Sequence, residues 1–123
     1  PISRAESDAE LGQRLERMRA LMSGFKKPFG HRLGRAMMAY VANYPDGDGI
    51  DRVREALADQ VEMRLLPKLR GVEVEMADPQ FDDLKRFVQG DLGDEELAEA
   101  IDHALDAARD GSGQFVWTGV TRG

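Results

Sequence analysis

The residues best suited to chemistry lie between positions 26 and 35, where basic side chains surround the expected start of a helix. Lys26 and Lys27 occupy a loop, and His31, Arg32 and Arg35 follow on the helix. Arg32 and Arg35 are three residues apart and therefore share a face. An arginine at a helix N-terminus binds phosphate well, because the free amide groups there attract the same anion. The pattern predicts phosphate binding, and surface ion pairs with the acidic helices remain the alternative.

Other chemistries lack the residues that they need. The chain has no cysteine, no GxxxxGK[ST] phosphate loop and only two histidines, His31 and His103, which fall in different expected helices without a ligand partner four residues on. Adjacent carboxylates such as those of Asp82 and Asp83 point to different helix faces. The turn at 44–49 has aspartates and glycines, but the twelfth position from Asp46 is Leu57 rather than a calcium-binding glutamate. We expect no metal site and no catalysis by this chain alone.

Composition excludes several classes of protein. The 123 residues are 41% hydrophobic and 33% charged, which is typical of a globular domain. No apolar run approaches the roughly 18 to 20 residues that cross a bilayer, so we expect a cytoplasmic protein with no membrane partner. The net charge of −6 divides into +4 for residues 1–40 and −10 for the rest. This charge balance disfavours direct nucleic-acid binding. It also disfavours a helix-turn-helix module whose recognition helix, residues 31–43, would contact DNA.

Hydrophobic periodicity predicts the elements that position these residues. Ser7 and Glu10 have the spacing of a capping box, and Asp94 is a second expected cap. Apolar and charged residues alternate strictly at 72–76, which permits a brief strand. Asp78 and Pro79 are expected to be a helix cap and the first helical residue after it. Apolar stripes predict helices over 8–23, 31–43 and 49–66, with two more beginning near 78 and 94.

The expected fold is all-α, a small bundle of about five helices with a short irregular or β-like C-terminal tail. Residues 1–110 form the helical domain, and 111–123 form a hinge and an apolar tail. Phe115, Val116 and Trp117 in that tail either bind a neighbouring protein or fold back on the bundle.

Two motifs give the chain a family resemblance that covers about residues 8–71. Phe29-Gly30-His31-Arg32 opens an apolar helix, and Leu65-Leu66-Pro67-Lys68-Leu69-Arg70-Gly71 closes the next long one. Together they resemble the C-terminal helical lid of McrB-like, restriction-associated AAA+ NTPases. His31 stands where that family has an aromatic residue.

The resemblance implies a role for each candidate residue. Arg32 would be the nucleotide-sensing sensor-2 arginine, and Arg35, Lys26, Lys27 and His31 would be secondary phosphate or interface residues. Leu66 and Leu69 would pack in the core, as structural parts of the second motif.

The resemblance also implies a larger assembly. ATP or GTP with Mg²⁺ would be bound by an α/β NTPase domain upstream of Pro1, and neighbouring subunits of a ring would complete the enzyme. The chain would then be the last piece of a longer protein and bind no cofactor alone. A free-standing helical adaptor or regulatory interaction domain is the alternative function.

Overall fold

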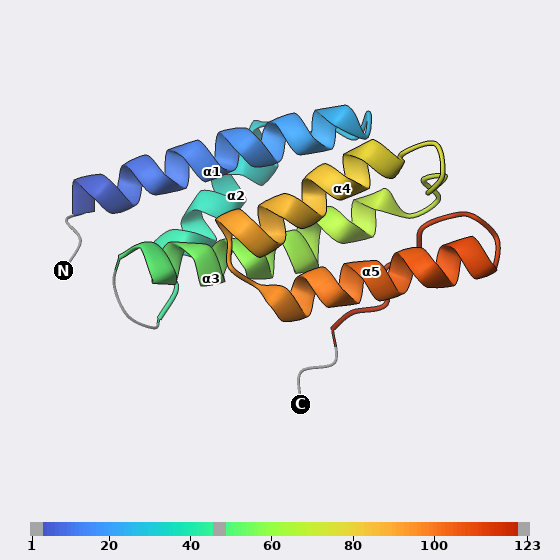
Figure 1. The fold of residues 1–123 in the computed structure, drawn as a ribbon. Helices are drawn as coiled ribbons and strands as arrows, with labels where there is room; N and C mark the ends of the chain where they lie inside the picture. The colour runs from blue at the N-terminus through green and yellow to red at the C-terminus, as the bar shows by residue number, and fades with distance from the viewer. Residues whose placement is uncertain (1–3, 46–48, 121–123) are drawn as a thin grey trace.

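The computed structural model describes residues 4–45 and 49–120, and within these ranges the chain is a small all-helical bundle, as predicted (Figure 1). The turn at 46–48, with its weak calcium-loop pattern, lies outside the described residues. The described α-helices are α1 (Arg4–Gly24), α2 (His31–Ala42), α3 (Ile50–Gln60), α4 (Asp78–Arg86) and α5 (Glu95–Asp110).

The third helix differs from its expected form. The segment expected as one helix over 49–66 is helical, but its α-helical part ends at Gln60 and is followed by a π-helical turn, Val61–Leu65, and a 3₁₀ turn, Leu66–Leu69. Pro67 accounts for the change, since it has no amide hydrogen and its ring clashes with the carbonyl four residues earlier in a regular helix. Leu66 and Leu69 are nevertheless fully buried, as the family resemblance implied.

Of the three expected helix caps, the one before α5 is confirmed and those before α1 and α4 are wrong. The capping box is wrong, because α1 begins at Arg4 and Ser7 lies inside it. Arg4, Ala5 and Glu6 favour helix and form its first turn. Asp94 does cap α5, since its Oδ1 accepts a hydrogen bond of 3.0 Å from the Leu97 amide. Asp78 is the first residue of α4 rather than its cap.

The segment before α4 pairs with the tail instead of forming an independent strand. Among the described residues, Glu73 and Gln114 form one isolated antiparallel bridge. The Phe115 amide donates to the Val72 carbonyl, and the Phe115 carbonyl accepts from the Gly71 amide, each at 2.9 Å. These bonds fold the tail back along residues 71–74.

Aromatic contacts join the tail to the helices. The Phe81 ring in α4 lies 4.7 Å from Phe25, just after α1, and 4.9 Å from Phe115, measured between ring centroids. Phe81 and Phe115 are completely buried, and Trp117 stacks on Phe115 at 6.5 Å. Aromatic pairs at these separations add to the stabilisation from burial. The tail is therefore part of the core.

A buried ionic contact connects α1 with α3. Glu10, only 9% exposed, lies 2.8 Å from the Arg14 guanidinium and 3.3 Å from that of Arg54. The two arginines offset the cost of removing the carboxylate from water. None of the described helices is long and apolar enough to cross a membrane.

Replacing Phe115 with alanine should lower the free energy of unfolding by about 3–5 kcal/mol, because it leaves a cavity beside Phe81. Val116→Ala is the matched control, since Val116 is 45% exposed and should cost little. Urea denaturation followed by far-UV circular dichroism measures both. Equal losses in the two variants would contradict the placement of Phe115 in the core.

Candidate functional site

The start of α2 is held in place by Arg19 of α1. The Arg19 guanidinium lies 4.7 Å from the Phe29 ring centroid, and its Nη1 donates a 3.2 Å hydrogen bond to the Phe29 carbonyl. Gly34 lies against the same guanidinium, and a Cβ at this position would overlap it. Glycine at position 34 therefore leaves room for the Arg19 guanidinium beside the first turn of α2.

The other end of α2 is held from α3. Arg52 donates hydrogen bonds to the carbonyls of Val41, Ala42 and Tyr44. These carbonyls have no further helical turn to bond with, so a guanidinium is a favourable partner for them. Two arginines thus secure α2 at both ends.

A basic pocket lies beside the N-terminus of α2. Arg32 lines it together with Arg64 from the π-helical turn and Lys68 from the 3₁₀ turn. All three side chains are exposed, and no carboxylate is among the described residues that line the pocket. Its remaining lining residues are Gly30, Leu33 and Ala36.

The geometry of this basic pocket suits an anion. Its volume of about 500 Å³ falls within the roughly 300–1,000 Å³ of small-ligand sites. No side chain caps α2 at Gly30, and the first turn of α2 contains no acidic residue. The helix N-terminus therefore adds its partial positive charge to that of the three cations.

The remaining predicted site residues lie outside the basic pocket. Lys26, Lys27, His31 and Arg35 are all exposed, and none of them is among its lining residues. Arg32 and Arg35 thus have different surroundings although they are one turn apart. Their roles as secondary phosphate or interface residues stay predictions.

The alternative of surface ion pairs finds no support at Arg32 or Arg35. In the described part of the chain neither residue pairs with a carboxylate, and the ion pairs that are present use Arg14, Arg54, Lys85, Arg86 and Arg109.

Sequence reasoning missed Arg64 and Lys68 as site residues. It assigned Lys68 to a structural motif and gave Arg64 no role. Their spacing of four residues near the end of the third expected helix was a usable signal, because it places two cations on one side of that segment.

A middle pocket continues from the basic pocket along α2. Ala36 and Arg64 line both pockets, so the two pockets are neighbours. The other residues of the middle pocket are Ala39, Tyr40, Asn43, Tyr44 and Pro45.

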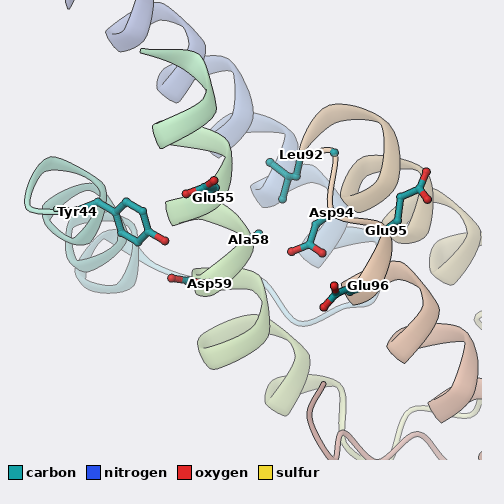
Figure 2. A pocket seen from close by; sticks show the side chains of 9 residues that line it. Tyr44, Glu55, Ala58, Asp59, Leu92, Asp94, Glu95 and Glu96 are labelled. Carbon is teal, nitrogen blue, oxygen red and sulfur yellow. The ribbon is translucent and has the colours of Figure 1, made fainter. Parts of the chain in front are cut away.

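An acidic pocket follows at the far end. Tyr44 lines it as well as the middle pocket, and the rest of its wall comes from α3 and the start of α5. Figure 2 shows Asp59 on the side of α3 nearer Tyr44, and Asp94 and Glu96 on the other side of that helix; all three line the pocket. Its full lining is Tyr44, Glu55, Ala58, Asp59, Leu92, Gly93, Asp94, Glu95 and Glu96.

Two tyrosines stand between the middle and acidic pockets. The Tyr40 hydroxyl donates a 2.9 Å hydrogen bond to Asp59 Oδ2, and this bond, with burial, raises the pKa of Tyr40 above 10.0. Burial and the nearby carboxylates of Asp59 and Glu55 raise the pKa of Tyr44. Both phenols therefore remain protonated well above neutral pH.

The carboxylates do not form a recognisable metal centre. Within residues 4–45 and 49–120, no group of three or more histidine, cysteine, aspartate or glutamate side chains is arranged to hold a metal ion.

Comparison with known proteins identifies a family without assigning an activity. A family model described as "Domain of unknown function (DUF8727)" matches residues 2–111. No curated protein and no solved structure matches the chain.

The hydrogen bond from Tyr40 to Asp59 should make a pH-dependent contribution to stability. Tyr40→Phe should lower the free energy of unfolding by about 1 kcal/mol at pH 8. Because the pKa of Tyr40 is raised in the folded state, the wild-type advantage is full below pH 10 and is lost as the pH rises through that raised pKa. Urea denaturation of the wild type and of Tyr40→Phe at about pH 8 and pH 11 checks this. The prediction is contradicted if the two proteins differ in free energy of unfolding by the same amount at both pH values.

Proposed function

We propose that this chain, which belongs to the DUF8727 family, is the helical lid of a restriction-associated AAA+ NTPase of the McrB-like type. In this role Arg32 senses the phosphates of ATP or GTP. The nucleotide and its Mg²⁺ are bound mainly by an α/β NTPase domain, in a cytoplasmic ring with neighbouring subunits. The observation that carries the proposal is the convergence of Arg32, Arg64 and Lys68 on one open pocket without a carboxylate.

Charge and geometry favour phosphate over other anions for this pocket. A polyphosphate carries several negative charges along its length, and three cations in one pocket can neutralise them together. The arginine guanidinium also presents a planar fork of donors that matches phosphate oxygens. None of the described lining residues has a side-chain oxygen that could bind Mg²⁺, so in this proposal the metal would be held by the α/β domain.

The pocket is fixed within a rigid unit, which suits a sensor. Arg19 holds the start of α2 to α1, and Arg52 holds its end to α3. Arg32 therefore moves with the whole bundle rather than by itself. An attraction between Arg32 and a nucleotide bound elsewhere would draw the bundle toward that nucleotide, and loss of a phosphate would release it.

The pocket should bind a polyphosphate weakly in the isolated chain. In ¹H–¹⁵N NMR titrations with inorganic tripolyphosphate, we expect the largest shifts at the start of α2 and near Arg64 and Lys68. Arg32→Ala and Lys68→Ala should each weaken binding by roughly tenfold, which corresponds to about 1.4 kcal/mol for one lost charged contact.

Arg35→Ala is the matched control for this titration, because it removes the same charge from the same helix outside the pocket. It should change the affinity by much less than Arg32→Ala. If the two variants weaken binding equally, the effect reflects general surface charge, and the pocket assignment fails.

In the complete NTPase, Arg32→Ala should reduce NTP hydrolysis by at least about tenfold while leaving thermal stability nearly unchanged, since Arg32 is exposed and forms no ion pair with a described residue. Steady-state phosphate release and thermal denaturation measure the two effects. Unchanged turnover would reject the sensor role. The adaptor alternative would be favoured if the reading frame that encodes this chain contained no Walker A element and the chain had no NTPase partner.

A further inference from the structure

Three neighbouring pockets along α2, which we together call the groove, share lining residues. Ala36 and Arg64 join the basic pocket to the middle pocket, and Tyr44 joins the middle pocket to the acidic pocket. The groove therefore runs from the N-terminus of α2 past its C-terminus to the start of α5.

The two ends of this groove carry opposite charge. Arg32, Arg64 and Lys68 line the basic end, where no carboxylate is among the described lining residues. Five acidic residues line the other end, and no lysine or arginine is among the described residues there. Of the three basic residues only Arg32 comes from the net-positive segment 1–40, and Arg64 and Lys68 come from the net-negative remainder.

The centre of the groove is suited to contact with another helix. Ala36 and Ala39 are small, so a partner backbone can come close to α2. The Tyr40 and Tyr44 rings, with centroids 5.8 Å apart, add aromatic surface beside them. Tyrosine is enriched at protein interfaces because it offers a large apolar area with a polar end.

We propose that a second copy of this chain occupies the groove, with the two α2 helices antiparallel across a two-fold axis. This arrangement places the basic end of each copy against the acidic end of the other. The required complement is present in the chain itself, which is why we favour a second copy over an unrelated partner. The proposal goes beyond the lid function, and because the second copy would cover Arg32, Arg64 and Lys68, dimerisation and phosphate binding at this pocket would compete.

The charges determine the orientation of this pair. A parallel arrangement would bring basic end against basic end and would be repelled, whereas the antiparallel one pairs opposite charges twice. Two-fold pairing also uses both ends of both grooves, so association stops at the dimer.

The experiment is sedimentation velocity over a range of protein concentrations. It compares the wild type with two single variants, one with a charge reversed at the basic end of the groove and one with a charge reversed at the acidic end. Wild-type protein should form a dimer that weakens as salt is raised. Lys68→Glu or Glu55→Lys should each raise the dimer dissociation constant by roughly tenfold or more, because each change introduces two like-charge contacts per dimer.

Mixing the two variants provides the decisive measurement. In a mixed dimer, position 68 of the Lys68→Glu copy faces position 55 of the Glu55→Lys copy, and the two reversed charges are again opposite. The other contact joins the unchanged Glu55 of the first copy to the unchanged Lys68 of the second. The mixture should therefore dimerise more tightly than either variant alone. Arg17→Glu and Glu75→Lys are controls with reversed charges outside the groove, and both should dimerise as wild type.

Three results would overturn the proposal. These are a wild-type chain that stays monomeric at all concentrations, a mixture no tighter than its components, and assemblies that continue to grow beyond two copies. Thermal denaturation of each variant identifies any that fails to fold, and the reciprocal pair Arg64→Glu with Glu95→Lys then takes its place.

Discussion

The contact of Phe81 with Phe25 on one side and Phe115 on the other is the interaction on which the arrangement of this bundle depends. It joins the end of α1, the middle of α4 and the tail, which are far apart in sequence. Phe29, also buried, lies four residues beyond Phe25 and receives Arg19 on its ring. The loop between α1 and α2 is therefore anchored by aromatic side chains at both ends. The direction of α2, and with it the basic pocket, follows from this anchoring.

Regular periodicity allowed the fold class and most helix positions to be predicted. The apolar spacing in 31–43 and the cap at Asp94 are local signals, and local signals were sufficient there. The errors arose where a local pattern competed with its neighbours. Ser7 can cap a helix, but the residues before it also favour helix, and Pro67 changed the hydrogen-bond pattern several residues upstream of its own position.

The candidate site was only partly predictable, because it combines residues from separate elements. Arg32 follows from its place at a helix start, which can be read from sequence. Its proximity to Arg64 and Lys68 depends on how the segment after α3 packs against α2, and no spacing in the sequence encodes that distance. The acidic end likewise brings α3 and the start of α5 together across more than 30 residues.

The pairing of the tail with residues 71–74 also bears on where the structural unit ends. The family model stops at residue 111, yet Phe115 fills the space beside Phe81 and Trp117 covers Phe115. A protein trimmed to the matched region would expose an apolar surface at the centre of the bundle and leave the Val72 carbonyl and the Gly71 amide without their partners. In this chain the packed unit therefore extends past the matched residues to Phe115 and Trp117.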